Sequence, residues 1–213
     1  MNRTSNPRPP AASAVEADQP AAGFDRAYFQ RFYANPATRV ALPADYANLA
    51  RFLAAYLRLL KLPVASILDV GAGMGGLRRP LLRAFPGSEY RGIDVSDYVC
   101  ARYGWQQRSI VDFAPGCFDL VVCHDVAQYL SAREASDALC NLAELCRGAL
   151  YFSALTREDW RNNCDQQRTD RAVHLRSARW YAERLKPAFR NAGGGVFIAR
   201  RANAVCYALH AGA

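Results

Sequence analysis

A glycine-rich turn after an apolar run constrains the fold of this chain more than any other segment. Residues 67–70 are apolar except for Asp69, and Gly-Ala-Gly-Met-Gly-Gly follows at 71–76. A helical pattern begins immediately afterwards, at Leu77. In an open α/β sheet, a strand, an acid, a glycine turn and a helix form a crevice for a nucleoside-bearing ligand at the carboxyl edge of the strands. The segment therefore predicts a sheet of this kind with a cofactor at its edge.

The glycines of this turn meet the requirements of such a crevice. Glycine adopts positive φ without strain and leaves no side chain between the backbone and the ligand. Amide N–H groups at the start of the helix can then face an anionic group. The motif alone does not separate S-adenosylmethionine from NAD, because both present an anion there. We expect the cofactor to contact Gly71, Ala72, Gly73 and Gly75.

The rest of the chain alternates between helical and strand patterns. Besides the helix after the glycine turn, helices are predicted at 24–34, 43–61, 97–103, 132–147 and 177–191. Strands are predicted at 64–70, 90–95, 106–111, 118–123, 149–155, 196–199 and 204–209, the last two forming a hairpin. Segment 156–175 is polar and irregular. We expect residues 1–22 to be a disordered tail and 23–213 to form one domain.

The composition excludes several other classes of protein. The net charge of +8 comes from 27 basic and 19 acidic residues, but the arginines are scattered rather than clustered, which argues against nucleic acid as a partner. No apolar run approaches the roughly 18 residues of a membrane span. Seven cysteines without a C-x-x-C pair, and no secretion signal, predict reduced thiols in a cytoplasmic protein. No metal site is predicted, because the three histidines lack ligand partners nearby in sequence.

Two acids extend the glycine motif. Asp69 stands two positions before Gly71, and Asp94 ends the second predicted strand, 23 residues after Gly71. A carboxylate at that strand end can accept hydrogen bonds from both hydroxyls of a ribose, which NAD would require as well. With the alternating elements, this pattern resembles the class I S-adenosylmethionine-dependent methyltransferases, over about residues 64–155. The resemblance implies an α/β, doubly wound, mainly parallel seven-stranded sheet with a C-terminal antiparallel hairpin and helices on both faces.

The resemblance also implies roles for individual residues. Asp69 would hold the glycine loop or the methionyl amino group, and Asp94 the ribose, with Val95 beside it. Asp112 would accept from the adenine amino group, and Phe113 would pack on the adenine ring. The run 118–123 matches the fourth strand of the family, in which Asp119 braces the start of the strand.

Methyl transfer is an in-line displacement at an activated carbon, so that the enzyme mainly aligns the acceptor and excludes water. A general base is needed only for an acceptor that is protonated near neutral pH. Residues just beyond the fourth strand would face the methyl group, and the candidates are His124, Asp125 and Tyr129. His124 either acts as this base or only lines the adenosyl site, and both interpretations stay open.

Two segments outside the alternating core are expected to bind the acceptor. The first is the aromatic helix at 24–33, which includes Tyr28 and Tyr33, and the second is segment 156–175, which includes His174. The aromatic helix either closes as a lid over the cofactor or simply packs on the edge of the sheet. The second segment is dense in polar residues, as substrate loops are, but solvated surface loops share that composition.

The predicted function is S-adenosylmethionine-dependent transfer of a methyl group to oxygen or nitrogen of a small molecule. A catalytically silent S-adenosylmethionine-binding module remains an alternative. So does an NAD-linked oxidoreductase, which would usually need a further substrate domain. A nucleic-acid or protein methyltransferase is a third, but no N-P-P-Y-like motif follows the fourth strand, where Cys123-His124-Asp125-Val126 stands. The acceptor and the oligomeric state do not follow from the sequence.

Overall fold

A single mixed sheet forms the centre of the computed structural model, which describes residues 23–207. Its strand order is β3-β2-β1-β4-β5-β7-β6. The strands are β1 Ser66–Val70, β2 Glu89–Asp94, β3 Gln106–Gln107, β4 Phe118–His124, β5 Cys146–Ser153, β6 Phe189–Asn191 and β7 Val196–Ala199. Strands β3, β2, β1, β4 and β5 run parallel, whereas β7 is antiparallel to both β5 and β6. This arrangement confirms the predicted fold class.

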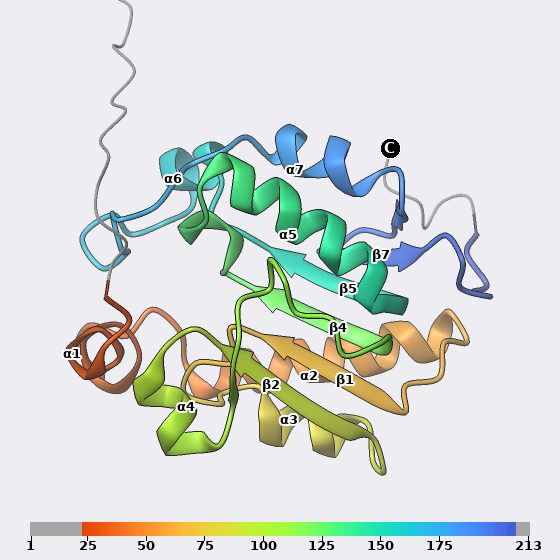
Figure 1. The fold of residues 1–213 in the computed structure, drawn as a ribbon, viewed down its shortest axis with the longest axis horizontal. Coiled ribbons are helices and arrows are strands. Elements are labelled where there is room, and N and C mark those ends of the chain that lie inside the picture. The colour runs from red at the N-terminus through yellow and green to blue at the C-terminus, as the bar shows by residue number, and fades with distance from the viewer. Residues whose placement is uncertain (1–22, 208–213) are drawn as a thin grey trace, which may run out of the picture.

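Helices cover both faces of the sheet, as Figure 1 shows for α5 and α7 on one face and α2 and α3 on the other. The helical elements are α1 Arg26–Phe29, a π-helical turn η1 Gln30–Ala34, α2 Pro43–Leu59, α3 Arg78–Ala84, α4 Asp97–Tyr103, a 3-10 turn η2 Ala127–Tyr129, α5 Ala132–Leu145, α6 Arg157–Asn162 and α7 Ala178–Leu185. Successive residues of β4 serve the two faces in turn: Leu120 and Val122 pack toward α2 and α3, and Val121 toward α5. The apolar run from Leu120 to Cys123 is the composition expected of a strand segment that is buried on both faces.

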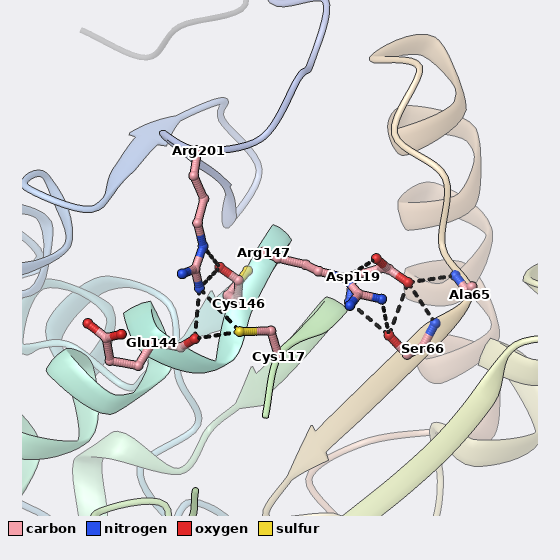
Figure 2. A network of polar contacts seen from close by, with 8 residues as sticks. All are labelled: Ala65, Ser66, Cys117, Asp119, Glu144, Cys146, Arg147 and Arg201. Carbon is pink, nitrogen blue, oxygen red and sulfur yellow. Dashed lines mark hydrogen bonds and ion pairs between the residues drawn. The ribbon is translucent and has the colours of Figure 1, made fainter. Parts of the chain in front are cut away.

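The amino ends of β1 and β4 are joined by the carboxylate of Asp119 (Figure 2). Its Oδ2 accepts hydrogen bonds from the backbone N–H groups of Ala65 and Ser66, both at 2.9 Å, and from the Ser66 hydroxyl at 3.0 Å. Its Oδ1 accepts from Arg147 Nε at 2.6 Å. Partial burial raises the pKa of Asp119, but these hydrogen bonds together lower it. Asp119 thus has the bracing role implied by the resemblance, at the opposite end of the strands from the glycine loop.

Figure 2 also shows how Arg201 closes the carboxyl end of α5. Its guanidinium donates to the carbonyl oxygens of Ala143, Glu144 and Cys146 at 2.7–3.2 Å. Carbonyl groups in the last turn of a helix have no partner within the helix, and a cation satisfies them while complementing the helix dipole. The contact ties the segment after β7 to the junction of α5 and β5.

Three predicted elements differ from the structure. The third strand, predicted at 106–111, is paired only at Gln106–Gln107, since the residues after it turn away and the Asn141 side chain binds the carbonyls of Ile110 and Phe113. The helix predicted at 177–191 ends at Leu185, and Phe189–Asn191 is already a strand.

The terminal hairpin consists of different strands from those predicted. Gly193, Gly194 and Gly195 all have positive φ and form its turn, so that β6 and β7 pair, rather than residues 196–199 and 204–209. Residues 204–207 form no strand, and Val205 N–H instead donates to the carbonyl of Leu60 at 3.0 Å. Residues 208 and 209, like the predicted tail at 1–22, lie outside the described residues.

Candidate active site

The glycine turn leaves β1 at the carboxyl edge of the sheet, where β2 and β4 also end. Gly71, Gly73 and Gly75 have φ values of +65°, +49° and +74°, the left-handed conformation that glycine adopts at least cost. A Cβ atom at Gly71 would lie 2.4 Å from the Cγ2 atom of Val126. Both conformation and space therefore require glycine at position 71.

Hydrogen bonds from β2 hold this turn in place. The Ala72 N–H donates to the carbonyl of Ile93 at 3.0 Å, and the Gly73 N–H donates to Asp94 Oδ2 at 2.9 Å. Asp94 Oδ1 accepts from the Ser96 N–H at 2.9 Å. The Asp94 carboxylate is buried, and this burial raises its pKa despite the backbone hydrogen bonds. Asp94 therefore braces the glycine turn together with the start of α4.

Trp105 is a residue of this site that sequence reasoning missed. Its indole Nε1–H donates to the carbonyl of Gly73 at 2.8 Å. The ring also packs where Gly92 and Gly75 lack side chains, at 2.7 Å and 3.0 Å from their ideal Cβ positions. Gly92, inside an otherwise ordinary strand, was the available signal, because an interior glycine often marks the close approach of another group.

Asp69 is fully enclosed at the end of β1. It is 2% exposed and accepts a hydrogen bond from the hydroxyl of Tyr90. Burial raises the pKa of Asp69 to about 7, against the lowering effect of the Tyr90 hydrogen bond and with a further increase from Asp94. A carboxylate whose pKa is raised this far would be stabilised by a cationic partner, because that partner would offset the cost of desolvating its charge.

The residues predicted beside the ribose and the adenine have different surroundings. Val95 is half exposed and lines a small open hollow with Phe24, Ser96 and Gln107. Asp112 is exposed and Phe113 is buried in the core under α5, and neither lines this hollow. Val95 thus lies at the hollow next to Asp94. The side chain of Phe113 packs beneath α5, so the geometry gives no support to a contact between Phe113 and an adenine ring.

The first described helix lies against the glycine turn. The Ser96 hydroxyl donates to the carbonyl of Phe24, and the Phe29 ring approaches within 3.6 Å of the ideal Cβ position of Gly73. The Tyr28 hydroxyl is hydrogen-bonded to that of Tyr129, at 2.8 Å. Residues 24–33 therefore pack over this edge of the sheet, as both a lid and a plainly packed helix would, and are joined to the segment that follows β4.

His124 and Asp125 come together at the end of β4. Asp125 has φ +57°, unusual for a residue other than glycine. Its Oδ1 accepts from the Ser153 hydroxyl at 2.9 Å, and its Oδ2 lies 3.6 Å from His124 Nε2. Their side chains are 28% and 48% exposed, respectively. Strained backbone held by neighbouring groups is typical of functional positions.

Two tyrosines that the sequence did not reveal flank His124. The rings of Tyr46, from α2, and Tyr151, from β5, have centroids 6.4 Å and 5.9 Å from the imidazole. Burial raises the pKa of Tyr46 to about 12, with Asp125 and Asp69 raising it further. The pKa values of Tyr33, Tyr129 and Tyr151 are also raised, first by burial and also by Asp125. These phenols stay neutral over the physiological pH range.

Segment 156–175 contacts the segment after β4 through the backbone of His174 rather than through its imidazole. The His174 N–H donates to the carbonyl of Gln128 at 2.7 Å, while its side chain is exposed. Hydrogen bonds from Ser131 mainly lower the pKa of Glu134, and His174 adds to this effect, which places the imidazole near the start of α5. The structure thus separates His174 from Tyr28 and Tyr33, the other predicted acceptor residues.

Within residues 23–207, no group of three His, Cys, Asp or Glu side chains is arranged to hold a metal ion. In the same range, no helix combines the length and the apolar character that crossing a membrane requires.

Comparisons with known proteins agree with the geometry. Residues 68–148 match a family model described as a methyltransferase domain. No curated protein matches the chain. Among solved structures, an O-methyltransferase family protein from Burkholderia thailandensis is 16% identical, with a TM-score of 0.53 over 75% of this chain, which spans 58% of that protein.

Two further solved structures are similar over nearly their whole length. Magnesium protoporphyrin IX methyltransferase from Synechocystis PCC 6803, with bound SAM, is 18% identical, with a TM-score of 0.55 over 83% of this chain and 95% of that one. The N-methyltransferase NodS from Bradyrhizobium japonicum WM9 is 20% identical, with a TM-score of 0.51 over 73% and 97% of the two chains. At these identities the likeness establishes the fold.

Proposed function

We propose that this chain, which carries a methyltransferase domain over residues 68–148 and has the corresponding fold, is a class I S-adenosylmethionine-dependent methyltransferase that methylates an oxygen or nitrogen atom of a small molecule. Solved structures with this fold include proteins described as O- and as N-methyltransferases. S-adenosylmethionine, when bound, supplies a methyl group on a sulfonium centre that is already activated toward displacement.

The residues at the carboxyl edge of the sheet fit this cofactor. The single observation that carries the proposal is the glycine turn flanked by two buried carboxylates, Asp69 and Asp94. Asp69 would face the methionyl ammonium group, whose charge would offset the desolvation of the carboxylate. Asp94 would accept from the ribose hydroxyls, and the positive-φ glycines leave room for the backbone to approach.

The acceptor side is formed by residues that follow β4 and by the lid. Asp125 and His124 stand where a proton would be removed from an acceptor, should it carry one, with Ser153 fixing the orientation of Asp125. The hydrogen bond between Tyr28 and Tyr129 joins the lid to η2, and the lid would exclude water from the reacting atoms. Positioning and exclusion of water are the main contributions that an enzyme makes to a displacement of this kind.

Calorimetry followed by label transfer tests the proposal. S-adenosylmethionine and S-adenosylhomocysteine are titrated into the full chain, and radiolabel is then followed from the methyl group into a fractionated small-molecule extract. We expect both ligands to bind and label to appear in a small molecule. Binding without transfer to any acceptor would favour the silent cofactor-binding module instead. Absence of binding would refute the assignment altogether.

A further inference from the structure

Five tyrosines and two aspartates gather on the acceptor side, and we call them the tyrosine–aspartate cluster: Tyr28, Tyr33, Tyr46, Tyr129, Tyr151, Asp125 and Asp170. They come from five separate parts of the chain: the lid, α2, the segment after β4, β5 and segment 156–175. The ring centroids of Tyr28 and Tyr33 are 6.2 Å apart, and the hydroxyls of Tyr28 and Tyr129 are 2.8 Å apart. Tyr46 also packs on Gly76 of the glycine turn, so the cluster begins next to the cofactor edge and extends away from it.

Asp170 lies beside the hydroxyl of Tyr129. Its Oδ1 accepts from the Ala172 N–H at 3.0 Å and its Oδ2 is buried, while its charge and a side-chain hydrogen bond with Tyr129 add to the rise in the pKa of that phenol, which burial mainly causes. None of the ion pairs found within residues 23–207 includes Asp170. Burial raises the pKa of Tyr28, and Asp170 adds to that increase, which places the carboxylate beside the phenols. A partly buried carboxylate charge is costly unless a cation pairs with it.

Apart from His124, which lies 3.6 Å from Asp125, the ion pairs found within residues 23–207 give neither aspartate a basic partner. The buried guanidinium of Arg176 donates to the carbonyls of Ala127, His174 and Leu130, all backbone atoms. Arg168, from the same loop as Asp170, donates to the carbonyl of Arg39. The cluster therefore presents negative charge together with the electron-rich faces of phenol rings.

The acids needed by the cofactor are separate. In the function proposed above, Asp69 faces the methionyl ammonium and Asp94 the ribose. Asp125 and Asp170 remain over, and both would repel an acceptor that carries a carboxylate, a phosphate or a phenolate. A cationic acceptor is favoured by the carboxylates and by the aromatic faces alike.

We infer that the acceptor is an amine that enters as an ammonium ion and is held by Asp125 and Asp170 among the tyrosine rings. This inference rests on the proposed function and specifies its substrate class. One proton passes from the ammonium nitrogen to the imidazole of His124. The freed lone pair then forms the new N–C bond while the S–C bond of the sulfonium breaks, and the electrons of that bond remain on sulfur as a thioether. The product is a methylated ammonium ion.

The inference is tested by binding two compounds of the same shape that differ in one charge. Choline and 3,3-dimethylbutan-1-ol are titrated into the full chain saturated with S-adenosylhomocysteine, and binding is followed by ligand-observed NMR. We expect choline to bind about 10-fold more tightly, the preference that a desolvated cation–π site with a carboxylate gives. Equal affinity, or tighter binding of the neutral alcohol, would overturn the inference.

Variants in segment 156–175 test which acid causes the preference for choline. We expect Asp170→Asn to reduce the preference for choline, with the affinity for S-adenosylhomocysteine unchanged. Asp165→Asn is the matched control, because Asp165 is an exposed acid of the same loop whose Oδ1 binds only the Gln167 N–H. A preference that survives Asp170→Asn in full would remove Asp170 from the site.

Product analysis separates the inference from the proposed function on which it rests. Label transferred from S-adenosylmethionine is expected in a compound that cation exchange retains at neutral pH and that base does not release as methanol. A neutral or base-labile labelled product would leave the methyltransferase intact but refute the amine. Failure to bind S-adenosylhomocysteine would refute the methyltransferase assignment, and the amine with it.

Discussion

Replacing Asp94 with alanine separates its two roles, bracing the glycine turn and binding the ribose. The side chain accepts hydrogen bonds from the Gly73 and Ser96 N–H groups, both at 2.9 Å. A hydrogen bond to a charged group contributes about 1.5–3 kcal/mol net. Because burial has raised the pKa of Asp94, removing the carboxylate also relieves a desolvation cost. We therefore expect the free energy of unfolding to fall by about 1–3 kcal/mol, measured by urea denaturation.

Affinity for the cofactor is expected to fall separately. Loss of the ribose contact should weaken binding of S-adenosylhomocysteine by about 1.5–3 kcal/mol, or roughly 10- to 150-fold by calorimetry. Asp137→Ala, which removes an exposed carboxylate on α5, is the control and should change neither quantity appreciably.

A thermodynamic cycle distinguishes contact from bracing. The wild-type chain and Asp94→Ala are each titrated with S-adenosylhomocysteine and with its 2′-deoxy analogue. If Asp94 binds the hydroxyl, deleting the hydroxyl costs affinity in the wild type and little in the variant. If the cost is the same in both, Asp94 only supports the turn, and the ribose assignment is wrong.

Three further predictions follow from single residues. Gly71→Ala should lower the free energy of unfolding by about 1–3 kcal/mol in thermal or urea denaturation, because it adds both positive-φ strain and a clash with Val126. Gly87→Ala, at φ +81° with open space around it, should show the strain alone, and equal losses in the two variants would contradict the clash. Affinity for S-adenosylmethionine should rise about 10-fold per pH unit up to about pH 7 and then level off, because Asp69 must lose its proton to bind an ammonium group; calorimetry of Asp69→Asn should show no such slope. Asp119→Asn should lower the free energy of unfolding by about 1–2 kcal/mol at neutral pH. Because the pKa of Asp119 is lowered in the folded protein, its stabilisation is complete above the unfolded value of 3.8 and is lost as the pH falls through the folded value. The stabilities of the wild type and the variant should therefore become equal in acid.

The parts of the site that could be predicted are those encoded within short segments. The glycine turn, Asp69 and Asp94 lie within one strand–turn–helix–strand unit, so spacing alone indicates that they meet. The tyrosines around His124 come from α2 and β5 and approach it only through the packing of the sheet, which no local pattern reports. Gly76 is a trace of this packing, because a Cβ atom there would lie 2.6 Å from the Tyr46 ring, but a glycine does not say which ring fills its space.

The terminal hairpin shows a second limit. Three glycines after a helical pattern can end a helix or form a turn between strands, and both are consistent with positive φ. The choice depends on long-range burial: Phe189 is 1% exposed and packs on Phe197 with ring centroids 6.5 Å apart. That contact exists only if the chain has already become a strand before the glycines.

Phe24 and helix α1 contact two sides of the proposed reaction site at once, through Phe24 on Ser96 and Tyr28 on Tyr129. If these residues must move for the spent nucleoside and the methylated product to leave, the two releases are kinetically coupled. Where such an opening is slower than chemistry, it sets the turnover number. The first turnover should accordingly appear as a burst in rapid quench, ahead of a slower steady state paced by the N-terminal segment.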